Sequence, residues 1–203
     1  MEQKPFILGI NGSPHKDGMT YELLASVLEA ASAQGAETRI INLYDLRTEW
    51  IDGAYSEDPK SDTLKNAVKD DITALYPEII RADGLVLATP VYWANMSAAM
   101  KNFIEHLTPL ENDGFLLQGK VAAFISSSKE NEGGVEMAAM DMVAPLAQMG
   151  VLIPPNAVMW YPSYWSNAKQ EKVSWAVEDA PKVGHNMVRL IETLKSNPID
   201  WSK

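Results

Sequence analysis

The chain has 203 residues, of which 46% are hydrophobic, and a formal net charge of -10 at pH 7. This length and apolar content predict a sizeable buried core, and we expect one domain over residues 1–203. Because the sequence contains no cysteine, it excludes disulfides, thiolate zinc sites, cysteine-bound iron–sulfur clusters and a cysteine nucleophile.

The charge and the hydropathy pattern argue against nucleic-acid and membrane partners. Nucleic acid is bound largely through clustered lysine and arginine, and the sequence contains no such cluster. No window approaches the roughly 20 uncharged apolar residues that span a bilayer, and residues 1–5 lack the pattern of a leader. We therefore expect a soluble, unprocessed, cytoplasmic protein with no membrane or nucleic-acid partner. No metal site is predicted, so any redox chemistry must come from a bound cofactor.

Five short apolar runs predict strands that are covered on both faces: residues 6–10, 40–43, 85–88, 121–125 and 157–160. Between and after them, apolar residues recur at helical spacing in residues 23–31, 96–107, 135–146 and 173–191. Pro181 is expected to kink or divide the last of these helices. Alternation of strand and helix predicts a doubly wound α/β sandwich, a parallel sheet with helices on both faces.

Two stretches fit this rhythm poorly. Residues 45–62 are too long for an ordinary connection, and residues 161–165 place three aromatic side chains around a proline. Long loops in compact domains are usually functional or disordered. We expect both stretches to flank a site or a subunit contact.

The loop after the first strand, residues 11–18, has the composition of an anion site. In such sheets ligands bind beyond the carboxyl ends of the strands. Gly12 and Gly18 permit close backbone approach, Ser13 and Thr20 supply hydroxyls, and the helix that begins near Met19 offers unpaired N–H groups. The pattern predicts a bound phosphate, and the alternative is a plain turn that caps the helix.

The loop lacks two known nucleotide-binding motifs, and their absence narrows the class of phosphate ligand. A triphosphate loop needs a lysine before its last hydroxyl residue, but this chain has Met19 before Thr20. The dinucleotide fingerprint needs Gly-x-Gly-x-x-Gly, whereas the glycines here are Gly9, Gly12 and Gly18. A single terminal phosphate fits better.

Two further loops should open on the same edge of the sheet. Residues 89–95 carry Tyr92 and Trp93 in an expected turn, where exposed aromatic rings favour a flat ligand; the alternative is that both rings pack under helices. Residues 126–134 form a polar loop that ends on paired glycines, suited to the polar edge of a heterocycle; the alternative is a solvated connection. His15, His106 and His185 are expected to be structural or solvated, since no acidic partner is visible in the sequence.

Taken together, these motifs resemble the flavodoxin-fold NAD(P)H-dependent FMN reductases and quinone reductases. The resemblance rests on Gly12-Ser13-Pro14, on Gly18-x-Thr20, and on residues 89–93 followed by residues 97–104. It covers about residues 6–150. It implies a flavodoxin-like three-layer sandwich with a five-stranded parallel sheet of order 2-1-3-4-5, bound FMN, and a homodimer or homotetramer with sites near subunit interfaces.

The resemblance also implies where FMN would lie. Its phosphate would bind the first loop, its ring would rest on the second, and the third would lie near the pyrimidine edge. The implied cofactor-binding residues are Ser13, His15, Gly18, Met19, Thr20, Pro90, Val91, Tyr92, Trp93, Asn95, Ser126, Ser127, Ser128, Gly133 and Gly134. Tyr92 and Trp93 would wall the substrate space, and no residue is assigned as catalytic because the flavin carries the chemistry.

The chain departs from the family at two places. Many relatives carry Cys-x-x-Cys in the segment that matches residues 50–54, where this chain reads Trp-Ile-Asp-Gly-Ala. That difference removes any cluster-bearing variant. His15 stands where relatives often have arginine, so the sequence does not say how the extra phosphate of NADPH would be recognised.

The resulting hypothesis is a ping-pong oxidoreductase. It would pass hydride from NADPH or NADH through FMN to a quinone, a flavin or a similar small acceptor. The main alternative is a flavodoxin-type carrier that exchanges single electrons with a protein partner, for which the acidic surface is suggestive. A third hypothesis is a flavin-free protein that binds another phosphorylated ligand or a partner.

Overall fold

The computed structural model describes residues 4–51, 64, 65, 67–128, 133–162 and 174–201. Its strands are β1 (Phe6–Asn11), β2 (Glu37–Asn42), β3 (Gly84–Tyr92), β4 (Asn95–Met96), β5 (Val121–Ser128) and β6 (Val158–Pro162). Its helices are α1 (Met19–Ala33), the 3-10 turn η1 (Leu43–Asp45), α2 (Asp71–Ala74), α3 (Tyr76–Arg81), α4 (Ala98–Glu105), α5 (Thr108–Asn112), α6 (Val135–Gln148) and α8 (Ser174–Ser196). No helix in these ranges is both long and apolar enough to cross a membrane.

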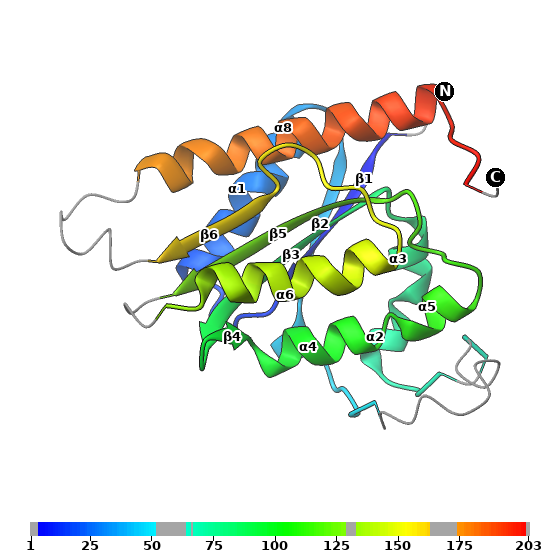
Figure 1. The fold of residues 1–203 in the computed structure, drawn as a ribbon, viewed down its shortest axis with the longest axis horizontal. Coiled ribbons are helices and arrows are strands. Elements are labelled where there is room, and N and C mark those ends of the chain that lie inside the picture. The colour runs from blue at the N-terminus through cyan, green and yellow to red at the C-terminus, as the bar shows by residue number, and fades with distance from the viewer. Residues whose placement is uncertain (1–3, 52–63, 66, 129–132, 163–173, 202–203) are drawn as a thin grey trace.

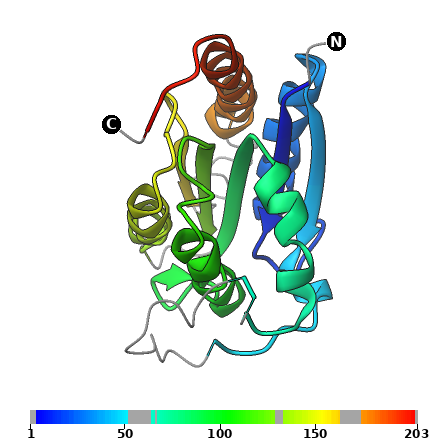
Figure 2. The same cartoon turned by 90° about the vertical axis from the view of Figure 1, so that its right-hand side faces the viewer.

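The sheet has the predicted order. Its parallel strands run β2-β1-β3-β5-β6, and the two-residue strand β4 pairs antiparallel with the end of β3 (Figures 1 and 2). Because β4 only forms a hairpin on β3, the fourth and fifth predicted strands correspond to β5 and β6. The predicted flavodoxin-like order 2-1-3-4-5 is therefore confirmed.

Helices cover both faces of the sheet, as Figure 1 shows for α8 on one side and α4 and α6 on the other. Side chains of β1 divide between the two layers: Leu8 packs with α3, α4 and α6, whereas Ile7 packs with α1 and α8. Gly9 shares the α1 face, where a Cβ atom would lie 2.6 Å from the Leu28 side chain. The tight packing of α1 on the sheet thus requires glycine at this position.

Two sequence predictions about the elements were wrong, and three short helices were not predicted. Strand β2 was expected to be covered on both faces, but most of its residues are partly or fully exposed because it forms an edge of the sheet. Helix α8 is not divided, since it continues through Pro181 and keeps one apolar face against α1. The short helices α2, α3 and α5 were missed because each is too short to show a periodic pattern.

Parts of the two irregular stretches lie outside the described residues. Residues 52–62 of the first stretch and residues 163–165 of the second are not described, nor is Val173 at the predicted start of the last helix. Of the second stretch, Tyr161 belongs to β6 and is buried.

Candidate functional site

The loop after β1 is organised by the Asn11 side chain. Its Oδ1 accepts the Ser13 N–H at 3.1 Å, and its Nδ2 donates to the Ser13 carbonyl at 3.2 Å and to Asn42 Oδ1 at 3.0 Å. The Ser13 Oγ accepts the His15 N–H at 3.1 Å. Asn11 was not selected from the sequence as a site residue, although an Asn two residues before a Ser in a turn is a recognisable signal.

Beyond His15 the backbone of this loop is open. The N–H groups of residues 16–21 donate to no acceptor in the described part of the chain, and the first bond of α1 is Glu22 N–H to the Gly18 carbonyl at 3.0 Å. Gly18 is the N-cap and has no side chain to satisfy these donors. A run of unpaired N–H groups at a helix N-terminus is an anion-binding arrangement.

Two buried hydroxyls lie beneath the loop. Thr20 Oγ1 and Ser127 Oγ are 2.7 Å apart, which joins the first and third predicted loops directly. Ser13 and Thr20 are both buried, whereas residues 14–17 are exposed. Two hydroxyls that share one hydrogen bond retain one further hydrogen, so the pair can still donate to an anion.

The second predicted loop is a tight hairpin. Strand β3 runs on to Tyr92, and Tyr92 pairs with Asn95 across a two-residue turn. The turn residues Trp93 and Ala94 have φ values of 51° and 61°. Two positive φ values identify a primed hairpin turn, which is strained for residues other than glycine, asparagine and aspartate.

The aromatic side chains of this hairpin are open to solvent. Trp93 is 99% exposed and Tyr92 is 42% exposed, so the predicted exposure holds and the rings do not pack under helices. Pro90 and Val91 belong to β3 and are partly buried. The N–H groups of Trp93 and Ala94 have no acceptor within the described ranges.

The hairpin is fixed against α6. Gly134, with φ of 84°, lies so close to Ala94 that a Cβ atom at position 134 would be 2.5 Å from the Ala94 Cα. The Asn95 Nδ2 donates to Asp141 Oδ2 at 2.6 Å. These contacts bring Gly134 and Asn95, two predicted site residues, together at one corner of the sheet edge.

The third predicted loop begins later than expected. Ser126, Ser127 and Ser128 are buried residues of β5 rather than loop residues, because this central strand continues its pairing with β6 through residue 128. The Ser126 hydroxyl donates to the Val135 carbonyl at the start of α6. Residues 129–132 lie outside the described residues, and Gly133 and Gly134 precede α6.

Ser97, the N-cap of α4, connects the first loop to the hairpin. Its hydroxyl donates to the Gly12 carbonyl at 2.7 Å and accepts the Met100 N–H at 3.2 Å, and its own N–H donates to Thr89 Oγ1 at 2.9 Å. Sequence reasoning placed Ser97 only in a family motif. The signal for its role is a serine directly before a helical apolar stripe.

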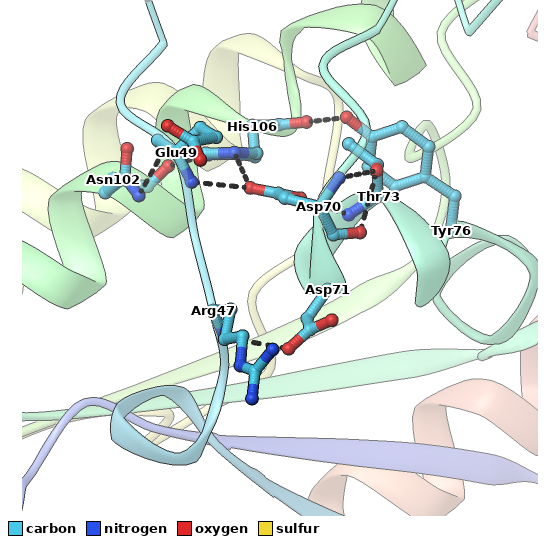
Figure 3. A network of polar contacts seen from close by, with 8 residues as sticks. All are labelled: Arg47, Glu49, Asp70, Asp71, Thr73, Tyr76, Asn102 and His106. Atoms are coloured by element: carbon cyan, nitrogen blue, oxygen red, sulfur yellow. Dashed lines mark hydrogen bonds and ion pairs between the residues drawn. The ribbon is translucent and has the colours of Figure 1, made fainter.

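A buried polar network joins the C-terminal end of α4 to the chain around α2 (Figure 3). His106 Nε2 is 2.9 Å from Asp70 Oδ2, and both side chains are almost fully buried. The same carboxylate oxygen accepts the Glu49 N–H at 3.0 Å, and the Asn102 Nδ2 donates to the Glu49 carbonyl at 3.1 Å. His106 is thus structural, as expected, but its acidic partner was not visible in the sequence because Asp70 lies 36 residues away.

The pKa values of Asp70, in the buried network, and Tyr92, in the hairpin, are shifted in opposite directions. Burial raises the pKa of Asp70, but hydrogen bonds from the Thr73 and Glu49 N–H groups and the nearby His106 outweigh burial, so the pKa falls below its ordinary value. Burial raises the pKa of Tyr92, and the neighbouring Tyr44 raises it further. Tyr92 thus keeps its proton at neutral pH.

Comparison with known proteins gives three principal matches. The sequence profile described as NADPH-dependent FMN reductase matches residues 5–165. An iron–sulfur flavoprotein of Methanocaldococcus jannaschii is 31% identical over 130 residues, which are 64% of this chain and 65% of that protein. An iron–sulfur flavoprotein of Archaeoglobus fulgidus is 26% identical over an alignment of 204 positions, and this alignment covers 94% of this chain and 97% of that protein.

Among solved structures, the chain is similar to RosB, crystallised with bound 8-demethyl-8-formylriboflavin-5'-phosphate. The TM-score is 0.75, the sequence identity is 21%, and the match covers 96% of this chain and 82% of RosB. At this identity the match shows the shared fold.

Proposed function

The chain belongs to the NADPH-dependent FMN reductase family, and from this premise we propose that it is an FMN-dependent NAD(P)H oxidoreductase. It passes hydride from NADPH or NADH through bound FMN to a quinone, a flavin or a similar small acceptor in a ping-pong cycle. The flavin supplies hydride acceptance and release when bound. The protein binds it, orients it and shapes the space in which the substrates lie.

The observation that carries this proposal is the open backbone after β1. The N–H groups of residues 16–21 have no acceptor among the described residues, and the hydroxyl pair of Thr20 and Ser127 keeps one hydrogen to donate, so together they form a set of hydrogen-bond donors. A phosphate monoester offers acceptor oxygens and a negative charge, which such donors and the start of α1 favour. The donor set therefore fits the terminal phosphate of FMN.

The hairpin fits the flavin ring. The N–H groups of Trp93 and Ala94 have no acceptor in the described chain, and the ring edge of a flavin carries nitrogen and carbonyl acceptors. Residues 90–95 would support this edge, with Tyr92 and Trp93 beside the substrate space. Ser126, Ser128 and Gly133 stay in the proposal as residues near the pyrimidine edge.

The proposal leaves out the cluster named in the relatives' descriptions. Iron–sulfur clusters are held mainly by cysteine thiolates, and this sequence has no cysteine. We therefore propose FMN as the redox group of this chain. We also propose that the protein is cytoplasmic and forms a homodimer or homotetramer that acts on small molecules.

The experiment that tests the function begins with the absorbance spectrum of the purified protein with and without added FMN. NAD(P)H should bleach the flavin band under anaerobic conditions, and each nicotinamide cofactor should then be oxidised with a quinone. Slow bleaching would instead support the flavodoxin-type carrier, which the net charge of -10 also suits. Protein that stays colourless after FMN addition would refute both.

The phosphate site has its own test. Replacing Ser13 and Thr20 together by alanine should weaken FMN binding by roughly 100-fold or more, since two hydrogen bonds to a charged group contribute about 1.5 kcal/mol or more each. The matched control is the double alanine variant of Ser32 and Thr193, two exposed residues on the α1 and α8 helices. Equal FMN affinity in both double variants would place the phosphate elsewhere.

A further inference from the structure

An open pocket of about 310 Å³ lies at the amino edge of the sheet, at the other end of the strands from the candidate cofactor site. It lies where the end of α3, the start of β5 and the end of α8 meet. Leu194 and the buried Ile191 form an apolar part of its lining on α8. The proposed oxidoreductase activity uses none of the residues that line this pocket.

Lys120 borders the pocket, and its ammonium group is bound to uncharged groups. Its Nζ donates to the Ile80 carbonyl at 2.7 Å and to the Ala82 carbonyl at 2.5 Å, and it forms no ion pair with any described carboxylate. Asp83, the carboxylate in the pocket lining, instead pairs with Lys195 at 2.7 Å and accepts the Phe6 N–H at 2.8 Å. Lys120 thus differs from the lysines that pair with carboxylates elsewhere on the surface, which are Lys16, Lys101 and Lys182.

The two carbonyl contacts of Lys120 suit a neutral amine as well as an ammonium group. They hold two of the three ammonium hydrogens, and the third has no acceptor in the part of the chain that the structure describes. Loss of this third hydrogen keeps both hydrogen bonds and leaves a lone pair on the nitrogen. Burial favours that loss and lowers the pKa of Lys120 to about 8, against the opposing effect of Asp83. A neutral amine is the form of lysine that attacks a carbonyl carbon.

The charged side chains of the pocket favour an anionic reactant. Besides Lys120, the lining contains Arg81 at the end of α3 and Lys195 on α8, and Asp83 is its one carboxylate among the described residues. Arg81 also pairs with Glu37 at 2.9 Å on the surface. Three cationic side chains around one carboxylate give a local excess of positive charge in a chain whose net charge is -10.

We propose that Lys120 is a site of covalent modification, at which its amine takes up a small acyl group from an activated, anionic acyl donor. The pocket beside Lys120 admits the acyl end of the donor, and Arg81 and Lys195 attract its anionic part. Acyl phosphates and acyl thioesters of phosphorylated carriers share this chemistry. The proposal is independent of bound FMN and of the proposed oxidoreductase activity.

The acyl transfer needs no oxidant or reductant. The Lys120 nitrogen attacks the carbonyl carbon of the donor and forms an amide bond, while the bond from that carbon to the phosphate oxygen or the thioester sulfur breaks. The leaving phosphate or thiolate keeps the electron pair of the broken bond and takes up the proton that the amine loses. The resulting amide carries one N–H, so it can keep at most one of the hydrogen bonds to the Ile80 and Ala82 carbonyls.

The test measures the acetylation rate of each lysine in the full-length chain at pH 8, by mass spectrometry of its peptides. Acetyl phosphate and acetyl-coenzyme A are used in parallel, with FMN present to occupy the loop after β1. The reference is Lys182, an exposed lysine whose pKa is raised by its hydrogen bond with Asp179. At pH 8 about half of Lys120 is neutral, against less than about 1% of Lys182. Because a less basic amine is also a weaker nucleophile, Lys120 should react roughly 10-fold faster than Lys182 with at least one donor, and that donor identifies the source.

A pair of variants tests the role of the pocket. Leu194→Trp places an indole ring in the lining and should slow the acetylation of Lys120 several-fold, while the rate of Lys182 stays unchanged. The matched control is Leu190→Trp, about one turn earlier on α8 and outside the lining, which should leave both rates unchanged. Equal Lys120 rates in the two variants would overturn the proposal. So would a Lys120 rate no greater than that of Lys182 with both donors in the wild-type protein, a comparison that decides by itself if Leu194→Trp does not fold.

Discussion

Gly134 packs directly against Ala94 in the candidate site. Gly134 has a positive φ and leaves no room for a Cβ atom, since that atom would lie 2.5 Å from the Ala94 Cα and 2.7 Å from its carbonyl oxygen. Gly133 also has a positive φ, of 72°, but a Cβ atom there would meet nothing within 4 Å. A comparison of substitutions at Gly133 and Gly134 therefore separates the effect of steric contact from the effect of backbone strain.

This pair gives a prediction at the scale of one residue. Gly134→Ala should destabilise the fold by about 2–4 kcal/mol, because overpacking adds to the cost of a positive φ, whereas Gly133→Ala should cost about 1 kcal/mol. Chemical denaturation of both variants measures the difference. FMN affinity should fall in Gly134→Ala because the hairpin must move. Equal stability of the two variants would mean that the hairpin yields without cost.

At the scale of an element, α4 is the part that ties the site together. Its N-cap Ser97 binds Gly12 of the first loop and Thr89 of β3, so the start of one helix fixes two of the three predicted site segments. A buried serine that satisfies a carbonyl and a helix N–H cannot be removed without leaving both unpaired.

Ser97→Ala should therefore lower the free energy of unfolding by about 2 kcal/mol, the sum expected for a lost cap and a buried carbonyl left without a partner. FMN affinity should fall as well, since Gly12 loses its anchor. Denaturant unfolding and flavin titration test the two effects. Ser32→Ala, at an exposed position of α1, should change neither, and a Ser97→Ala protein with wild-type FMN affinity would contradict the anchoring role.

A second group of hydrogen bonds joins α4 to the chain around α2. Asp70 caps α2 by accepting the Thr73 N–H, binds His106 of α4, and holds the Glu49 backbone (Figure 3). Arg47 and Asp71 add two bonds between the same segments. One buried carboxylate thus fixes both ends of the connection between residues 49 and 70.

Asp70→Asn should cost about 3 kcal/mol at neutral pH, because it leaves a buried hydrogen-bond network partly unsatisfied. The pKa of Asp70 is lowered on folding, so its contribution is complete above the ordinary carboxyl range and is lost as the pH falls through the lower folded value. Wild type and variant should converge in acid, as measured by urea unfolding from pH 7 to 3. Asp179→Asn, in an exposed ion pair, should cost less than about 0.5 kcal/mol, and a pH-independent Asp70 deficit would contradict this account.

At the scale of the whole molecule, the two edges of the sheet differ in hydrogen bonding. Around the β1 loop and the hairpin the carboxyl edge leaves N–H donors open, whereas the amino edge is satisfied by its own side chains. Asp83 accepts the Phe6 N–H and the Lys195 ammonium, and Lys120 donates to the Ile80 and Ala82 carbonyls at the end of α3. Among the described residues, open N–H donors thus lie at one edge and side-chain pairing with the backbone at the other.

Lys120 makes global stability depend on pH in alkali. Burial lowers its pKa from 10.5 to about 8, with Asp83 opposing the shift. Between these values the unfolded chain binds more protons than the folded one, so this residue makes stability rise with pH. Lys120→Met should flatten that rise, measured as the difference in unfolding free energy between pH 8 and pH 10. Lys101→Met, in an exposed pair, should retain it; an unchanged slope in Lys120→Met would contradict the shift.

Much of the fold was predictable because it follows from local patterns. The apolar runs predicted the strands, the family resemblance implied their order, and small residues after the first strand indicated the anion loop. The extent of β5 was not predictable, since Ser126, Ser127 and Ser128 look like a polar loop. They extend the strand because β6 pairs with all three and β3 pairs with the first two. The pairing of His106 with Asp70 depends on how α4 packs against the chain before α2.

The sequence by itself determined the layered α/β architecture, the position of the β1 loop and the exclusion of thiol chemistry, because these depend on periodicity and composition within short segments. The single-domain prediction stays a prediction. Only the tertiary structure decided which loops meet: Thr20 with Ser127, and Ala94 with Gly134. Residues far apart in the chain come together through strand order and helix packing. The periodicity and composition of short segments carry no information about such distances.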